Sequence, residues 1–202
     1  EGAAWNARAR FPAASTLKLA IAVTTLARHS GLPARGSYLD ELFRKMITVS
    51  DDRAANDMEV FMAGSTSAGS ALVNELMRSI GLYESIMYGG YIVTRTPSAS
   101  IPVRVDERPY FGVGKYTTAW DMSRLWRAIW LASAGRGPLR RAQPGFTVAD
   151  ARHLLWWLAH VRDWRRLDTS LRGRAGISVL HKAGWVNQAR HDTGLVFWPR
   201  GV

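Results

Sequence analysis

Apolar residues recur with helical periodicity through most of the chain. Residues 15–29 form an apolar stretch that stops before Gly31 and Pro33, which predicts a helix with Ser15 or a near neighbour as its N-cap. Further amphipathic helices are predicted over residues 37–46, 52–62, 67–80, 117–131 and 147–161.

The periodicity is lost in two places. Residues 82–116 contain Gly89-Gly90 and several prolines, so we expect a long structured loop with short extended pieces. Residues 177–181 and 193–198 are typical of β-strands, and residues 184–189 are expected to form the loop between them. Helices in the middle and strands at the end predict an α+β protein in which a helical region is inserted between parts of a sheet region.

The composition is that of a globular protein. The chain has 202 residues, of which 47% are hydrophobic, and it is long enough to bury a core. Its longest apolar stretch, Leu19 to Val23, is too short to form a transmembrane segment, and no signal peptide can be read. The absence of cysteine excludes disulfides, thiolate metal sites and a cysteine nucleophile.

The net charge of +11 comes mostly from arginine. These arginines are scattered through helical stretches and none of the known nucleic-acid-binding motifs is present, so solvated helix faces are favoured over nucleic-acid binding. The charge is compatible with an anionic environment such as a cell envelope. The densest basic group comprises Arg162, Arg165, Arg166, Arg172 and Arg174. Nine tryptophans are present, and for those on helices, Trp126, Trp130, Trp156 and Trp157, core packing is favoured over a ligand-stacking surface.

Three short motifs could carry chemistry. Ser15 and Lys18 are separated by one helical turn. Ser50-Asp51-Asp52 lies at a predicted loop-to-helix junction, and Lys182-Ala183-Gly184 follows a predicted strand directly. Each motif alone has an ordinary explanation as a cap, a turn or a solvated strand end, and a Ser-x-x-Lys pair arises by chance about once in a chain of this length. Their order along the chain is the informative feature, because penicillin-recognising serine hydrolases carry Ser-x-x-Lys, Ser-x-Asn and Lys-Thr-Gly in this order.

The flanking residues strengthen this similarity. The segments FPAASTLKL, MITVSDDRAAND, YTTAWDMSRLW and HKAGWVNQARHDTGLV resemble segments of the class A β-lactamase family, in the family's order. The resemblance extends over most of residues 11–198. It implies a β-lactamase/transpeptidase-like fold, in which an antiparallel sheet is flanked by helices and an all-helical region is inserted.

The residue types suit nucleophilic catalysis. Ser15 would be the nucleophile at a helix N-terminus, and Lys18, on the same helix face, could accept its proton. Lys18 can do so only as a neutral amine, and lowering its pKa from about 10.4 to about 7 requires about 4–5 kcal/mol from burial and a nearby cation. We expect Lys182 to supply that cation.

The resemblance implies further roles. Ser50 would relay the proton to the leaving nitrogen, and Lys182 would also hold the substrate carboxylate, with Arg190 sharing in its binding. The backbone N–H groups of Ser15 and Trp185 would form the oxyanion hole. The substrate-binding set is therefore Asp52, Lys182, Ala183, Gly184, Trp185 and Arg190, and neither a metal nor a cofactor is expected.

Three departures from the family pattern bear on activity. Asp52 replaces the asparagine of the middle motif, and its carboxylate would stabilise charged Lys18 and repel an anionic substrate. Ala183 replaces the threonine or serine of the last motif, so a hydroxyl that helps to bind the carboxylate is missing. The Glu-x-x-Leu-Asn segment that activates the deacylating water is absent. Asn56 matches the asparagine that contacts this glutamate, but the nearest carboxylates, Asp106 and Glu107, are assigned no role.

A Ser-His-Asp triad built on His191 and Asp192 is disfavoured. Adjacent residues of a strand point to opposite faces, and Lys18 already fills the role of the base. No His-x-x-x-His or comparable spacing indicates a metal site.

The expected architecture has two parts with the site in the cleft between them. Residues 1–35 and 170–202 form the sheet-containing part, and residues 36–169 the mainly helical part, within one catalytic domain. Relative to the family, the sheet is expected to be shortened at both ends, as a reduced architecture or as a fragment with an unpaired edge.

The expected function is a serine hydrolase that acts on β-lactam amides or acyl-D-amino-acid groups through an acyl-enzyme. The alternatives are a D,D-peptidase or esterase of the penicillin-binding type, a glutaminase of the same fold, and a degenerate binding or sensing domain. The resemblance implies a secreted or cell-envelope location, and the oligomeric state is left open.

Overall fold

The computed structural model describes residues 3–29, 31–91, 114–162, 167, 169–171, 173–186, 189–199 and 201. Its helices are a 3₁₀ helix Ala14–Leu17, α1 Lys18–Arg28, α2 Tyr38–Thr48, α3 Asp52–Ala63, α4 Thr66–Ser79, α5 Ala119–Ser133, α6 Pro138–Ala142 and α7 Val148–Leu158. Its strands are β1 Phe11–Pro12, β2 Tyr116–Thr117, β3 Ser178–Val186 and β4 Ala189–Phe197.

Side-chain caps define where five of the helices begin. In each of α2, α3, α4, α5 and α7 the residue before the helix accepts a hydrogen bond from a backbone N–H of the first turn. The capping residues are Ser37, Asp51, Ser65, Thr118 and Thr147. The helices predicted from periodicity are confirmed, with ends displaced by at most three residues.

The first helix begins differently from the prediction. Ser15 lies inside the 3₁₀ helix, which precedes α1 directly, and neither element has a side-chain cap. Ser15 as an N-cap is therefore wrong, and its hydroxyl is not used to start the helix.

The long hairpin is more extensive than the sequence predicted. Strands β3 and β4 pair antiparallel from Ser178 opposite Phe197 to Val186 opposite Ala189. The prediction of a loop over residues 184–189 is thus wrong, because the ladder continues through Gly184 almost to the tip. Gly184, within this ladder, permits a close packing that is described below.

A second, short pairing connects distant parts of the chain. Strand β1 pairs antiparallel with β2, with Phe11 opposite Thr117, and Ile86 forms a bridge with Tyr116. The parts of residues 82–116 that the structure describes therefore hold short extended pieces, as predicted, while residues 92–113 lie outside the described residues.

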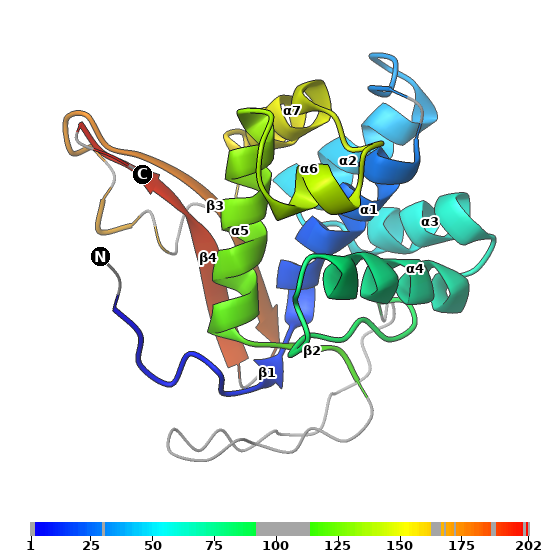
Figure 1. Cartoon of the computed structure of the whole chain (residues 1–202), viewed down its shortest axis with the longest axis horizontal. Coiled ribbons are helices and arrows are strands. Elements are labelled where there is room, and N and C mark those ends of the chain that lie inside the picture. The colour runs from blue at the N-terminus through cyan, green and yellow to red at the C-terminus, as the bar shows by residue number, and fades with distance from the viewer. Residues whose placement is uncertain are drawn as a thin grey trace.

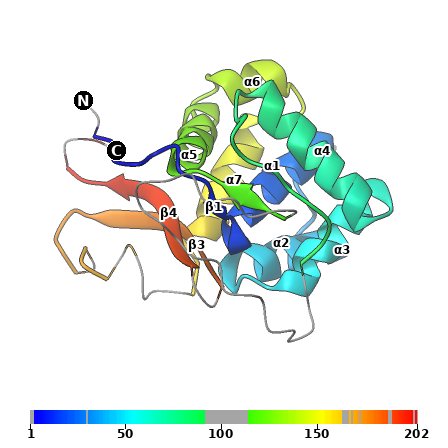
Figure 2. The ribbon, with the colours of Figure 1, turned by 90° about the horizontal axis from the view of Figure 1, so that it is seen from below.

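Helix α1 forms the centre of the molecule. It contacts α2, α3, α4 and α7, and Figures 1 and 2 show it among these helices. Its residues from Lys18 to Leu26 are all buried. Of the helices that contact α1, α2 carries Phe43 and α7 carries Trp157, and the two rings stack with centroids 4.7 Å apart.

The hairpin lies against helices on one side. Helix α5 packs against β4, as Figure 1 shows, and β3 contacts both α7 and the 3₁₀ helix. Trp126 of α5 donates a hydrogen bond to Thr193 Oγ1 of β4 at 3.0 Å. Core packing is confirmed for Trp126 and Trp157 but is wrong for Trp156, whose side chain is exposed.

The result is an α+β fold of helices and small antiparallel sheets, as predicted. The division into parts at residues 35 and 170 stays a prediction. Of the helices that the structure describes, none has the length and apolar character needed to cross a membrane.

Candidate active site

Lys18 lies at the first position of α1 and is fully buried. Its ammonium group donates hydrogen bonds to the backbone carbonyl of Ser50 and, at 2.6 Å, to Asp52 Oδ1. The Ser50 hydroxyl lies 3.4 Å from Lys18 Nζ. The first two motifs therefore meet in space, although 32 residues separate Lys18 from Ser50.

The third motif reaches the same hydroxyl from the hairpin. Lys182 Nζ of β3 donates a hydrogen bond to Ser50 Oγ at 2.7 Å and another to the Ala183 carbonyl at 3.0 Å. Lys182 is buried, with only 1% of its surface exposed. Ser50 Oγ thus lies between two lysine side chains, which come from opposite ends of the sequence.

Ser15 is positioned by the close approach of β3. Gly184 is packed so tightly that a Cβ atom on it would lie 2.9 Å from the backbone nitrogens of Ser15 and Thr16 and 3.1 Å from the Ala13 carbonyl oxygen. Only glycine leaves room for this contact. The backbone between Gly184 and Trp185 is thereby held beside the N–H of Ser15.

Backbone strain is present at Ser50 and directly before Ser15. Ser50 has φ 61°, and Ala14, directly before Ser15, has φ 45°. A non-glycine residue in the left-handed region costs of order 1–3 kcal/mol and persists only where surrounding contacts enforce it. Strain of this kind is concentrated at functional sites, and here it flanks both candidate catalytic hydroxyls.

The electrostatics of Lys18 result from opposing effects. Burial lowers its pKa below the ordinary lysine value, while Asp52, through charge and a hydrogen bond, and Asp51, through charge, raise it. The ammonium of Lys115 lowers it further. The net direction is downward, which favours the neutral amine that a general base requires.

Tyr91 and Lys115 are site residues that sequence reasoning missed. The Tyr91 ring centroid lies 4.7 Å from Lys18 Nζ and 4.5 Å from Lys115 Nζ, so both ammonium groups contact the ring. The Tyr91 hydroxyl donates to the Ala14 carbonyl at 3.2 Å, and Lys115 donates to the Gly90 carbonyl at 2.6 Å. No sequence pattern indicates these contacts, because all of them are long-range.

Asn56 binds the backbone of Tyr91. Its side chain donates to the Tyr91 carbonyl at 2.9 Å and accepts from the Tyr91 N–H at 2.5 Å. It therefore fixes the backbone of Tyr91, whose ring lies against Lys18 Nζ. Asp106 and Glu107 lie outside the described residues.

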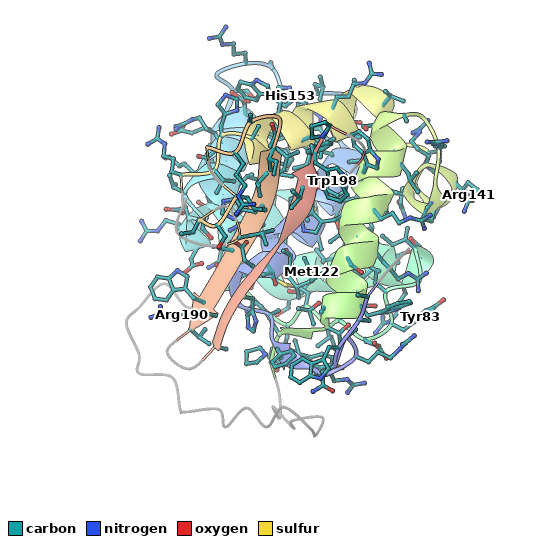
Figure 3. All side chains as sticks on the ribbon, turned by 90° about the vertical axis from the view of Figure 1, so that its left-hand side faces the viewer. Tyr83, Met122, Arg141, His153, Arg190 and Trp198 are labelled. Carbon is teal, nitrogen blue, oxygen red and sulfur yellow. The ribbon has the colours of Figure 1, made fainter. Side chains whose placement is uncertain are left out.

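The remaining predicted residues lie near the tip of the hairpin. Trp185 and Arg190 are directly opposite each other in the ladder, and both are exposed. Figure 3 labels Arg190 beside the lower end of the hairpin. Ala183 is buried beside Lys182.

The neighbouring histidines are engaged elsewhere. Asp192 accepts a hydrogen bond from His181 Nδ1 at 3.0 Å, across the strands. His191 packs against the ring of Phe11, and burial lowers its pKa. Asp192 is thus paired with His181 and does not orient His191, which agrees with the rejection of a triad.

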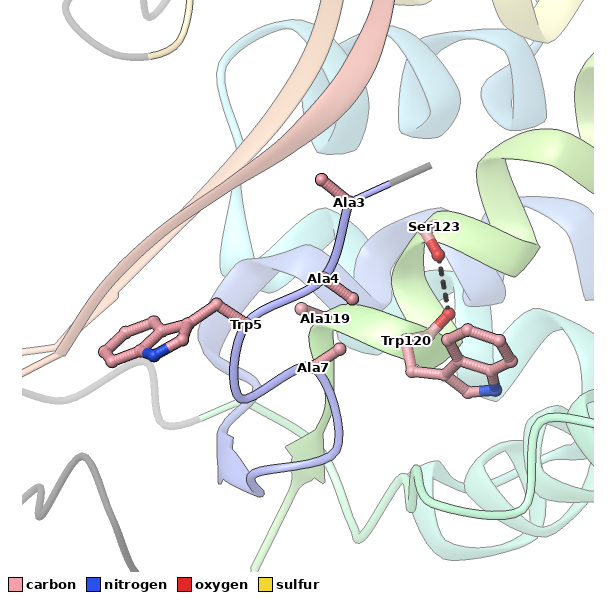
Figure 4. A pocket seen from close by; sticks show the side chains of 7 residues that line it. All are labelled: Ala3, Ala4, Trp5, Ala7, Ala119, Trp120 and Ser123. Atoms are coloured by element: carbon pink, nitrogen blue, oxygen red, sulfur yellow. Dashed lines mark hydrogen bonds between the residues drawn. The ribbon is translucent and has the colours of Figure 1, made fainter. Parts of the chain in front are cut away.

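Two hollows lie close to these elements. A cavity of about 260 Å³ is lined by Phe11, Thr16 and Arg190, among others, where β4 crosses the start of α5. A larger, open hollow of about 630 Å³ lies between the N-terminal segment and α5, as Figure 4 shows, and contains none of the candidate catalytic residues. Within the described ranges there is no group of three or more His, Cys, Asp or Glu side chains able to hold a metal ion.

Comparison with known proteins gives the family of this chain. A family model described as the Beta-lactamase enzyme family matches residues 29–202. The chain therefore belongs to the beta-lactamase enzyme family, whose members are hydrolases. The matched range includes Ser50 and Lys182 but begins after Ser15 and Lys18. No curated protein matches this chain.

Solved structures show the same fold. An ancestral class A beta-lactamase (GNCA) matches with a TM-score of 0.71 and 19% identity, over 99% of this chain and 76% of that chain. The beta-lactamase of Sphaerobacter thermophilus matches with a TM-score of 0.65 and 18% identity, over 97% and 73%. The chromosome-encoded beta-lactamase of Vibrio parahaemolyticus matches with a TM-score of 0.67 and 15% identity, over 98% and 74%.

Proposed function

We propose that the protein is a serine hydrolase that forms an acyl-enzyme on Ser15 with β-lactams or related acyl-D-amino-acid groups. The observation that carries this proposal is the convergence of Lys18 and Lys182 on Ser50 Oγ, with Gly184 pressed against the backbone of Ser15. Three ordinary motifs, spread over almost the whole chain, would not meet at one hydroxyl without a shared role.

Acylation would combine a nucleophilic attack with two proton transfers. Ser15 Oγ attacks the carbonyl carbon of the substrate amide and gives its proton to neutral Lys18. The C–N bond then breaks, and the leaving nitrogen takes a proton delivered through the Ser50 hydroxyl, which both lysines contact. The products are a serine ester and the free amine.

The tetrahedral intermediate needs donors for its negative oxygen. The backbone N–H groups of Ser15 and Trp185 would supply them, since β3 passes directly beside the 3₁₀ helix. Lys182 and Arg190 would attract the substrate carboxylate to the hairpin side of the site. Without the hydroxyl that Ala183 replaces, this carboxylate would be held less tightly.

Hydrolysis of the ester would be the slow step. Water must attack the acyl carbon and give its proton to a base while Ser15 regains its own. The Glu-x-x-Leu-Asn segment that would supply this base is absent from the sequence, and Asp52 keeps the Lys18 amine paired. We therefore expect acylation to be faster than deacylation, as in penicillin-binding proteins.

Two alternatives keep the same site. A D,D-peptidase or esterase would use the same acyl-enzyme with a different acyl donor, and a degenerate binding domain would bind without reacting. Asp52 and Ala183 favour the latter, because Asp52 pairs with Lys18 and opposes the neutral amine, and Ala183 lacks the hydroxyl of the family pattern. A secreted or cell-envelope location would give any of them access to cell-wall substrates.

Four assays with one protein sample separate these functions. A chromogenic cephalosporin reports β-lactam turnover, and a peptide or ester substrate reports the alternative hydrolysis. A fluorescent penicillin reports covalent labelling by the adduct that survives denaturation and reversible binding by its anisotropy. Labelling with a burst and slow turnover supports the proposed hydrolase, and labelling with rapid turnover of a peptide or ester substrate supports the alternative enzymes. Neither labelling nor turnover, with reversible binding retained, indicates the binding domain.

A further inference from the structure

The charged groups of the site differ in their access to a ligand. The Lys18 side chain is fully buried and Lys182 is nearly so, whereas 44% of the Asp52 side chain is exposed. A ligand in the site therefore meets the carboxylate of Asp52 more readily than either of these ammonium groups.

Asp52 can act toward a ligand only as an acceptor. Its Oδ1 accepts from Lys18 Nζ at 2.6 Å, and in the described part of the chain no other group donates to Asp52. An ionised carboxylate has no proton to donate, so its second oxygen requires a donor from solvent or ligand. A ligand carbonyl placed there would leave two acceptors facing each other, which costs binding energy.

Charge also orients the substrate within the site. A substrate carboxylate is repelled by Asp52 on α3 and attracted by Lys182 and Arg190 on the hairpin. The acyl end of the substrate is then left on the side of Asp52.

We propose that Asp52 makes the site selective for substrates that carry an ammonium group in their acyl part, on the α-carbon of the side-chain amide. This inference rests on the proposed function and names its substrate class. It follows because the carboxylate of Asp52 is exposed and can only accept hydrogen bonds, whereas the adjacent base, Lys18, is buried.

Binding of such a cation would also activate Lys18. Asp51 and Asp52 raise the pKa of Lys18 and Lys115 lowers it, while Lys182 faces it across Ser50. An ammonium group on Asp52 Oδ2 shares the carboxylate with Lys18 and adds positive charge close to it. Both effects favour the neutral amine, so the matching substrate would promote its own attack.

Three penicillins with the same phenyl-bearing acyl group test the inference. The α-carbon carries only hydrogen in benzylpenicillin, an ammonium group in ampicillin and a carboxylate in carbenicillin. Acylation rates of Ser15 are measured by intact mass at about pH 6, where α-amino groups are mostly protonated. We expect ampicillin to react about fivefold faster than benzylpenicillin, and carbenicillin about fivefold more slowly.

Two variants identify the source of the ranking. Asp52→Asn should reduce both ratios to below about twofold, whereas Asp57→Asn, which removes the same charge from the same helix, should preserve them. Equal rates for the three penicillins, or a ranking that Asp52→Asn leaves intact, would overturn the inference. Absence of any benzylpenicillin adduct on Ser15 would instead refute the proposed function, so the two failures are distinguishable.

Discussion

Gly184 has no room for a side chain, and this makes it the sharpest probe of how β3 supports Ser15. A Cβ atom at this position would lie 2.9 Å from the nitrogens of Ser15 and Thr16, where ordinary contact begins at 3.4 Å. The obstructing atoms belong to the backbone, so no side chain can rotate away. In Gly184→Ala the strand and the 3₁₀ helix must separate by about 0.5 Å.

The expected cost follows from this displacement. Overpacking of a tightly packed contact destabilises a protein by about 1–3 kcal/mol. A misplacement of 1 Å in a catalytic site costs about 100-fold in rate, so about 0.5 Å should cost about tenfold. Gly184→Ala should therefore acylate about tenfold more slowly with benzylpenicillin and melt several degrees lower.

A matched glycine provides the control. Gly114 also lacks a positive φ, and a Cβ on it would meet nothing within 4 Å, so Gly114→Ala should keep both the rate and the melting temperature. Rates come from intact-mass time courses and stability from thermal melts. A Gly184→Ala protein with wild-type rate and stability would refute the claim that β3 is pressed against Ser15.

Three further predictions concern charge and packing. Asp52→Asn removes a carboxylate that raises the pKa of Lys18, so the rise of the acylation rate with pH should move to lower pH in labelling time courses; a shift to higher pH would contradict this. Burial raises the pKa of Glu59 to about 7, so the stability from its neutral form is complete below about pH 4.5 and is lost as the pH rises through 7. Glu59→Gln should then raise the free energy of unfolding at pH 8, by at most about 3 kcal/mol, but not at pH 4.5, as measured by denaturant titration, and equal effects at both pH values would count against it. Phe43→Ala removes a ring stacked on Trp157 and should destabilise the fold by about 3–5 kcal/mol in denaturant titrations; a loss below about 1 kcal/mol would show that the stack is dispensable.

Local hydrogen bonding explains why the helices could be predicted. Ser37, Ser65 and Thr147 cap helices whose apolar faces repeat every three to four residues, so both signals lie within a few neighbouring residues. Ser15 is an exception, because a serine before an apolar stretch resembles an N-cap whether or not its hydroxyl accepts a capping hydrogen bond. Here the 3₁₀ helix leaves that hydroxyl available.

The hairpin was misjudged for a related reason. Gly184 and its neighbours resemble a loop in local composition, but a glycine within a strand also permits close backbone approach. Only the tertiary contact with Ser15 distinguishes the two cases. The prediction that Trp156 packs in the core was wrong because adjacent positions of a helix face different directions. Trp157 faces the core, whereas Trp156 faces solvent.

The site was predictable only in part. The order of the motifs indicated Lys18, Ser50 and Lys182, whose side chains the structure brings together, and the role of Ser15 stays a prediction. The contacts of Tyr91 and Lys115 with Lys18 join segments more than 70 residues apart, and no local pattern encodes them. The ion pair between Asp52 and Lys18 was foreseeable from charge alone, and it is present at 2.6 Å.

The central claim is that Ser15 is the nucleophile, and its most direct test is the mass of the intact protein after exposure to benzylpenicillin. The account predicts one added penicilloyl group, mapped by peptide fragmentation to Ser15, and no addition to Ser15→Ala. An adduct on another residue, equal labelling of Ser15→Ala, or no adduct on folded wild-type protein would contradict it.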